Sequence, residues 1–222
     1  MLENIDAIIF DIDGTLIDSM WVWTDIDDLF LEKYNLTEPE GFHEGMEGKS
    51  YSETAQYFLD LFPELPHTRE EIEAEWHEMA FEIYTTKIQL KKGAFAFIKD
   101  MYDAGVKLGI ATSNSRDLAE GTLKNNRVLA FFDSIWTSDE AKAGKPAPDV
   151  YLKVAESMGV KPERCLVFED VPKGIMAGKN AGMKVCAVED PFSKPQEVLK
   201  RELADYYIQD FDDIKNKTYE VL

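Results

Sequence analysis

The stretch FDIDGTLIDS, Phe10 to Ser19, ends a short apolar run with two carboxylates and a glycine. The run that starts at Ile5 is rich in branched and aromatic residues, which is typical of a buried strand. Side chains two positions apart on a strand point to the same face, so we expect Asp11 and Asp13 to converge at its carboxyl end. Open α/β sheets bind their ligands at this end. Because two unpaired carboxylates would repel each other, the pattern indicates a cation, a shared proton, or both.

Beyond this stretch, apolar strand-like runs alternate regularly with helical patterns. Gly105 and Gly159 each close one of these helical segments. The alternation predicts a parallel sheet with helices on both faces. The later strands are expected at residues 106–113, 134–138, 165–170 and 183–188, and the helices at 93–105, 116–126, 148–158 and 172–181.

A long insertion separates the first strand from the second. Three helical patterns lie between Ser19 and about Lys87. A crossover between parallel strands needs only about a dozen residues, so this segment is longer than the connection requires. We therefore predict an α/β fold in which a Rossmann-like parallel sheet core, residues 1–17 and 88–222, carries an inserted small helical cap domain, residues 18–87.

Composition limits the classes of partner. The chain has 222 residues, 45% of them hydrophobic, and a formal net charge of -19. This charge repels phosphate backbones and acidic lipid surfaces, so we expect neither nucleic acid nor a membrane as the partner. The first residues show no basic region followed by a long apolar segment. Cys165 and Cys186 lie in apolar runs typical of buried reduced thiols, so we expect a cytoplasmic protein. We separately expect a monomer.

Polar residues follow four of the predicted strands, where a ligand of the sheet would lie. The first group is 11–15, DIDGT, and the second is 111–115, ATSNS, which enters a helix. The third is 143–149, AGKPAPD, which offers Lys145 before a proline-initiated helix, and the fourth is 169–170, ED. Together these groups supply acids, phosphate-sized donors and one cation on the same predicted edge of the sheet.

These four groups resemble the motifs of the haloacid dehalogenase superfamily. DIDGT resembles the first motif, Thr112 in IATSNS the second, Lys145 in GKPAPDVY the third, and FEDVPKGIMAG the fourth. Each alone has an ordinary explanation, such as a turn or a helix cap, but four in this order support a functional interpretation. The helical insertion is similar to that of the phosphatase and β-phosphoglucomutase-like branch.

The resemblance implies roles for the acidic residues. It makes Asp11 the nucleophile, which forms an aspartyl-phosphate, and Asp13 the general acid and base. It implies Mg²⁺ as the cofactor, held by the side chains of Asp11 and Asp170 and the backbone carbonyl of Asp13. Glu169 either ligates the metal or lies behind it. Hard oxygen ligands favour Mg²⁺ over zinc.

Other residues are implied in substrate binding. Thr112, Ser113 and Asn114 would hold the phosphoryl oxygens, and the resemblance gives Thr112 and Lys145 both a catalytic and a binding role. Gly14 belongs to the same predicted site and turns the chain toward the cap. In the cap, Lys49 lies where the resemblance puts a substrate-specificity loop, although it is otherwise an ordinary exposed lysine.

The implied function is a phosphatase that hydrolyses a small phosphorylated metabolite, such as a sugar phosphate. The alternative is a β-phosphoglucomutase-like mutase, which passes the phosphoryl group to a second sugar hydroxyl. Trp23 and Tyr51 stand where those mutases carry a His and an Arg, which weakens this alternative. A non-catalytic binding module is expected to lose the nucleophile or Lys145, and this chain has both.

The remaining histidines and tryptophans have structural interpretations. The histidines lack metal-ligand spacing, so we expect all three at the surface: His43, His67 and His77. The tryptophans of the cap helices are expected in the cap core, although one could line the substrate cleft: Trp21, Trp23 and Trp76.

Overall fold

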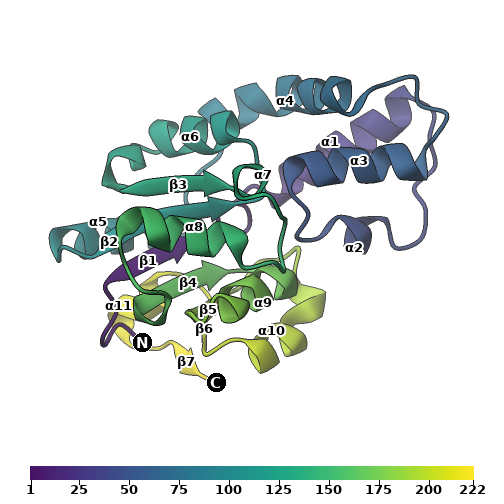
Figure 1. The fold of residues 1–222 in the computed structure, drawn as a ribbon. Coiled ribbons are helices and arrows are strands. Elements are labelled where there is room, and N and C mark those ends of the chain that lie inside the picture. Colours follow the sequence, from purple (N-terminus) through teal and green to yellow (C-terminus); the bar gives the residue numbers. More distant parts are fainter.

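A seven-stranded sheet forms the centre of the computed structural model, which describes residues 1–222 (Figure 1). Its strand order is β3-β2-β1-β4-β5-β6-β7, and every neighbouring pair is parallel except β6 and β7. This confirms the predicted α/β, Rossmann-like parallel sheet. The strands are β1 (Ala7–Phe10), β2 (Lys107–Thr112), β3 (Ser134–Thr137), β4 (Cys165–Glu169), β5 (Lys184–Val188), β6 (Tyr206–Ile208) and β7 (Glu220–Val221).

Helices cover both faces of the sheet because alternate side chains of each central strand point to opposite sides. Ile8 and Phe10 belong to one buried cluster, together with apolar side chains of α5 (Ala94–Asp103), α6 (Arg116–Asn125) and α11 (Asp212–Asn216). Ala7 and Ile9 belong to a second cluster on the other face. The helices around this second cluster are α8 (Asp149–Met158), α9 (Pro172–Asn180) and α10 (Glu197–Leu203).

The insertion after β1 forms four helices, grouped at one end of the sheet (Figure 1). Ser50 and Thr68 each begin a helix with a capping box, in which the side chain accepts from the backbone three residues later. Three helices were expected here, and the fourth, α2, has only five residues. The helices are α1 (Met20–Lys33), α2 (Phe42–Met46), α3 (Tyr51–Leu61) and α4 (Arg69–Thr86).

One hydrophobic cluster runs from the sheet into these helices. It includes Phe10 of β1, Leu118 of α6, Tyr84 of α4 and Phe58 of α3. The long helix α4 lies beside α6, as Figure 1 shows. The inserted helices therefore share buried apolar surface with the sheet layer, which favours a fixed arrangement of the two parts. The boundary of the cap at residues 18–87 stays a prediction.

The expected elements agree with the structure to within a few residues as far as β5, and differ after it. The chain beyond Val188 forms β6, β7, α10 and α11, for which no element was predicted. Short connecting elements were also missed, namely the helix α7 (Ser138–Ala141) and the 3₁₀ turns Leu129–Phe131, Pro162–Arg164 and Lys194–Gln196. None of the helices combines the length and apolar character that crossing a membrane requires.

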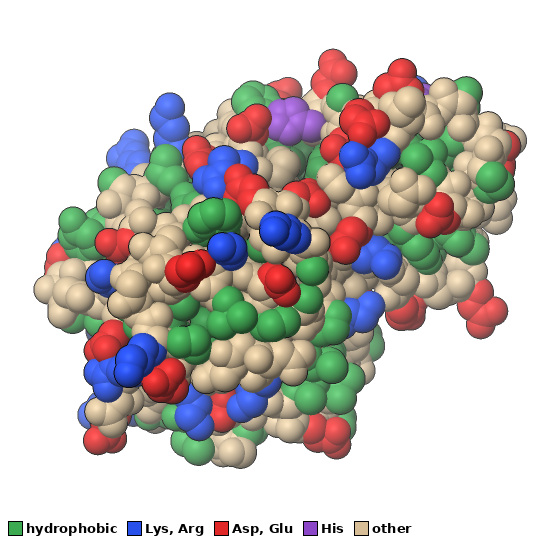
Figure 2. Space-filling model, viewed as in Figure 1, with side chains coloured by type: hydrophobic (Ala, Val, Ile, Leu, Met, Phe, Trp, Pro, Cys, Tyr) green, Lys and Arg blue, Asp and Glu red, His purple; other side chains and the backbone are tan.

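Acidic and basic side chains are interspersed over the face of the molecule that Figure 2 shows. Although the net charge is -19, basic side chains lie between the acidic ones on this face. No continuous basic surface is visible there. Such a surface is the usual electrostatic footprint of a protein that binds nucleic acid.

Candidate active site

The register of the sheet brings three strand ends together. Phe10 of β1 pairs with Ile110 of β2 and with Phe168 of β4. The residues that follow these three therefore lie at the same edge of the sheet, and Asp11 lies beside Glu169. The backbone N–H of Asp11 donates to the carbonyl of Phe168 at 3.1 Å. The predicted convergence of motifs at one sheet edge follows from this pairing.

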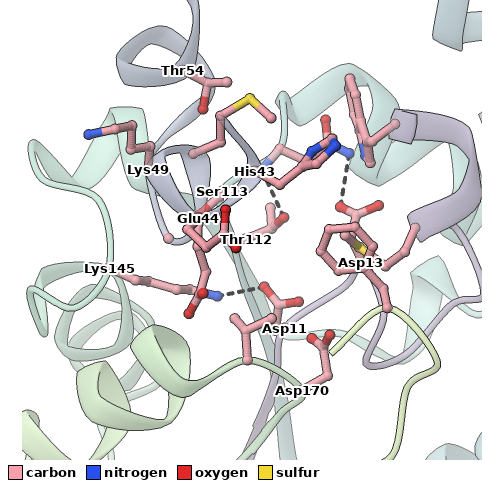
Figure 3. A pocket seen from close by; sticks show the side chains of 18 of the residues that line it. Asp11, Asp13, His43, Glu44, Lys49, Thr54, Thr112, Ser113, Lys145 and Asp170 are labelled. Carbon is pink, nitrogen blue, oxygen red and sulfur yellow. Dashed lines mark hydrogen bonds and ion pairs between the residues drawn. The ribbon is translucent and has the colours of Figure 1, made fainter. Parts of the chain in front are cut away.

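Lys145 holds two of these acids. Its ammonium group donates to Asp11 Oδ1 at 2.6 Å, as Figure 3 shows, and also to Glu169 Oε1 at 2.5 Å. Tyr151, from the helix that follows Lys145, donates to the same Glu169 oxygen at 2.6 Å. The lysine is only 5% exposed, so this cation and its two carboxylates form a buried ion triad whose members satisfy one another.

Burial and charge act on these groups in opposite directions. Burial raises the pKa of Asp11 well above its usual range, Lys145 opposes this, and Glu169 and Asp170 add to it. Burial likewise raises the pKa of Asp170 to about 7, helped by the charge of Glu169. Burial lowers the pKa of Lys145, but the carboxylates of Asp11 and Glu169 outweigh it, so that the net shift is upward. The edge therefore has more negative charge than one lysine neutralises.

The arrangement of carboxylate oxygens fits a divalent cation. Oxygens of Asp11, Glu169 and Asp170 lie within 4.8 Å of one another. Asp170 accepts from Thr15 Oγ1 at 2.8 Å through Oδ1, whereas its Oδ2 is buried without a partner. A Cβ on Gly14 would lie 2.4 Å from this same Oδ2. An orphaned buried carboxylate oxygen and a hard-oxygen donor set are what a Mg²⁺ site requires.

Asp13 has a separate set of partners. Ser19 Oγ donates to Asp13 Oδ1 at 2.6 Å, Tyr84 also donates to Oδ1, and Asn114 Nδ2 donates to Oδ2 at 3.0 Å. The expectation that Asp11 and Asp13 share a strand face does not hold, because β1 ends at Phe10 and the chain turns through Gly14. The two carboxylates are therefore held by different groups.

Tyr84 is one of the residues at this site that the sequence interpretation missed, with Thr15, Ser19 and Tyr151. It lies on α4, and burial raises the pKa of its hydroxyl well above its usual range, with the nearby Asp13 adding to this shift. The hydroxyl therefore remains a hydrogen-bond donor at neutral pH. The only sequence signal was its place on the apolar stripe of a helix, where an aromatic residue is usually part of the core.

The second motif enters α6 as expected. Thr112 Oγ1 accepts from the backbone N–H of Asn114 at 3.0 Å, and Ser115 caps the helix. Ser113 Oγ lies 3.5 Å from Ser138 Oγ. Thr112, Ser113 and Asn114 thus surround the start of a helix, where backbone N–H groups favour an anion.

A cavity of about 410 Å³ connects this edge with the inserted helices. Gly14 does not line it, and its N–H donates to the carbonyl of Ile17, so its proposed contact with substrate stays a prediction. The other predicted site residues all line the cavity: Asp11, Asp13, Lys49, Thr112, Ser113, Asn114, Lys145, Glu169 and Asp170.

One expected surface residue also belongs to this cavity. The His43 side chain is 34% exposed, and it lines the cavity wall with its ring perpendicular to that of Phe192, the centroids 6.2 Å apart. The structure brings it there from the short helix α2, which the sequence pattern did not indicate. Trp23 and Trp76 line the cavity, whereas Trp21 is 46% exposed.

The fold and the motifs identify the class of protein. The family model described as "Haloacid dehalogenase-like hydrolase" matches residues 8–188. A Drosophila melanogaster relative named "Probable pseudouridine-5'-phosphatase" is 34% identical over 197 residues, which are 86% of this chain and 84% of the relative. Hexitol phosphatase A of Escherichia coli (strain K12) is 32% identical over 192 residues, 85% of each chain.

Solved structures share the fold. The crystal structure of CbbY from Rhodobacter sphaeroides in complex with phosphate superposes with a TM-score of 0.82 at 23% identity, over 95% of this chain and 96% of that one. The β-phosphoglucomutase of Clostridium difficile gives a TM-score of 0.77 at 22% identity, over 96% and 95%. This chain belongs to the haloacid dehalogenase-like hydrolase family, as its four motifs predicted.

Proposed function

We propose that this chain is a Mg²⁺-dependent phosphatase that hydrolyses a small phosphomonoester through an aspartyl-phosphate on Asp11. The observation that carries this proposal is the buried pair of Lys145 and Asp11 at 2.6 Å, with Glu169 and Asp170 beside it and a cavity above it. The phosphatases among the relatives support the same reaction class.

Asp11 must be ionised and aimed at phosphorus in order to attack it. Lys145 favours the ionised form and fixes the direction of Oδ1. When bound, Mg²⁺ supplies positive charge that neutralises both the nucleophile and the phosphoryl oxygens. Asp11, Asp170 and the backbone carbonyl of Asp13 would hold it, and Glu169 would either join them or serve Lys145.

The second motif would bind the oxygens of the phosphoryl group. The Thr112 hydroxyl, the Ser113 hydroxyl and the N–H groups at the start of α6 offer donors to its oxygens. Lys145 adds a cation beside Asp11. The role of these groups is to position the phosphoryl group and to offset its charge, which is most of what a protein contributes to phosphoryl transfer.

Asp13 would transfer the proton. It gives a proton to the leaving alcohol in the first step and takes one from the attacking water in the second. Ser19, Tyr84 and Asn114 orient its carboxyl group from three elements. Its separation from the Lys145 network allows it to change protonation state while Asp11 remains a nucleophile.

Turnover of a phosphomonoester panel with Mg²⁺ tests this proposal, with free phosphate and sugar-phosphate isomers measured in the same reaction. We expect free phosphate from several esters, and its loss with a chelator or in Asp11→Asn. Glucose 6-phosphate formed from β-glucose 1-phosphate without free phosphate would instead identify a mutase. No turnover of any ester would favour a binding module. We also retain a monomer and a cytoplasmic location as expectations.

A further inference from the structure

One face of α1 lines the cavity along much of the helix. Met20, Trp23, Thr24 and Asp27 follow a three- and four-residue spacing, and all four contribute to the cavity wall. A helix rises about 1.5 Å per residue, so this stripe spans roughly 10 Å. It starts next to Ser19, which holds Asp13. A substrate whose phosphate lies at Asp11 would place its remaining atoms along this stripe.

Asp27 is a carboxylate at the far end of the stripe without a partner. It is only 8% exposed and accepts no hydrogen bond from the protein, and the imidazole Nδ1 of His43 lies 3.9 Å from Oδ2. Burial raises its pKa to about 7, with Asp28 and Glu38 adding to the shift. The Asp27 side chain is 12% exposed and lines the cavity, so its carboxylate is accessible from the cavity and receives no donor from the protein. A bound molecule can supply that donor.

The wall around Asp27 is poor in cations. It carries three carboxylates, of Asp27, Glu44 and Glu47, and one ammonium group, of Lys49. Lys49 lies over the ring of Tyr57 at 5.6 Å, and in Figure 3 it points away from Asp11 and Asp13. The ammonium group of Lys173 is bound to the backbone carbonyls of Glu44 and Glu47 and does not line the cavity. A second phosphate in this part of the cavity would therefore meet mainly acids, which disfavours it.

Aromatic rings complete the wall. Trp23 and Tyr51 pack edge to face with ring centroids 6.0 Å apart, and Tyr51 packs in the same way on Trp76 at 6.0 Å. The Tyr51 hydroxyl is directed elsewhere, because it donates to the carbonyl of Glu73 at 3.3 Å. Trp23 therefore offers a ring surface on the stripe, held in place by its neighbours, next to the free carboxylate.

We propose that the substrate is a monophosphate whose remaining part is uncharged, packs on Trp23 and donates hydrogen bonds to Asp27, and that a second phosphate is rejected. This inference rests on the proposed phosphatase function and specifies its substrate class. A polyol or sugar and a nucleoside share the required chemistry, namely hydroxyl or N–H donors on a neutral body.

Matched substrate pairs test the inference. We would compare fructose 6-phosphate with fructose 1,6-bisphosphate, and uridine 5'-monophosphate with uridine 3',5'-bisphosphate, at pH 8, where Asp27 is mostly ionised. The proteins are wild type, Asp27→Asn and the control Asp25→Asn, an exposed residue on α1. In at least one pair we expect kcat/KM of the monophosphate to be tenfold or more above that of the bisphosphate. Asp27→Asn should reduce this ratio about tenfold, and Asp25→Asn should leave it unchanged. The pair that responds distinguishes a sugar from a nucleoside.

Binding separates this inference from the proposed function. Calorimetric titration of Asp11→Asn with the same four compounds measures recognition without turnover. If wild type fails to hydrolyse p-nitrophenyl phosphate with Mg²⁺ but Asp11→Asn prefers a monophosphate, the proposed function fails and the inference stands. Equal or tighter binding of the bisphosphates, no binding of either monophosphate, or an unchanged ratio in Asp27→Asn would overturn the inference.

Discussion

The two walls of the cavity differ in how their acids are satisfied. At the sheet edge, Asp11 and Glu169 share the Lys145 ammonium group, and Tyr151 adds a further donor. On the inserted helices, Asp27 is equally buried but has no donor from the protein. At the first wall the protein supplies partners for Asp11 and Glu169, and only a metal cation is missing. At the second wall a donor for Asp27 has to come from a ligand. We infer that the sheet edge carries the chemistry and that the helical wall selects the ester.

The largest effect is expected at the sheet edge. Asp11→Asn keeps the shape of the side chain but removes the nucleophilic carboxylate, so we expect kcat to fall by at least about 10⁴-fold. Steady-state release of phosphate measures the loss. A variant that retains more than a tenth of the wild-type rate would show that another group attacks phosphorus.

At the helical wall we expect an effect on stability, because Asp27 is a buried acid without a donor from the protein. The pKa of Asp27 rises from its ordinary value of 3.8 to about 7 on folding. Folding therefore takes up a proton, and the wild type loses stability as the pH rises from about 4 to about 7. The charged groups that face Asp27 are Asp28, Glu38 and His43. The loss amounts to up to about 4 kcal/mol above pH 7.

Asp27→Asn removes this cost. Between pH 4 and pH 8 its free energy of unfolding should gain up to about 4 kcal/mol on that of wild type. Urea denaturation at both pH values measures this change, and Asp25→Asn, at an exposed residue of α1, is the control. Stabilisation that is the same at both pH values would mean that Asp27 is not held as a costly buried acid, and the contrast between the two walls would weaken.

A smaller effect is expected where the two walls meet. Tyr84→Phe removes one of three donors to Asp13 and leaves the ring packing, so we expect kcat to fall about tenfold with KM little changed. The pH profile of kcat should also shift, because Tyr84 orients the proton-transferring group. Tyr102→Phe, at an exposed tyrosine of α5, serves as the control. If Tyr84→Phe lowers stability but leaves the pH profile of kcat unshifted, Tyr84 contributes to packing and does not orient Asp13.

The smallest effect concerns the contact that joins the helical wall to the sheet layer. Glu47 accepts from the backbone N–H of Lys173 at 3.2 Å and from Gln196 Nε2 at 2.7 Å. Glu47→Gln weakens the charged acceptor, so we expect KM to rise by about threefold with kcat nearly constant. Steady-state kinetics with the best ester measures it. A KM equal to that of wild type would show that this contact between the helical wall and the sheet layer does not contribute to substrate binding.

The sheet edge was predictable from sequence because its signals are local. The apolar run before Asp11 sets one strand, Thr112 and Glu169 end two later runs, and Lys145 lies in the connection that follows a third, so chain order places all of them at one edge. Thr15 and Tyr151, which hold Asp170 and Glu169, were missed, and Asp13 was expected on the strand although β1 ends at Phe10.

The helical wall was not predictable in the same way. Tyr84 reaches Asp13 only because α4 lies beside α6, and His43 reaches Asp27 only because the five-residue helix α2 folds toward α1. These contacts depend on tertiary packing between segments whose patterns specify an apolar face but not its partner. Asp27 itself looks like any polar residue of an amphipathic helix.

Trapping the covalent intermediate tests the central claim most directly. Acid quench during turnover of the best ester with Mg²⁺, followed by mass spectrometry of the peptides, should show one phosphoryl group on Asp11 and none in Asp11→Asn. This result would place the chemistry at the sheet edge, as the account predicts. Rapid turnover with no phosphorylated Asp11, or with the group on a residue of the inserted helices, would contradict it.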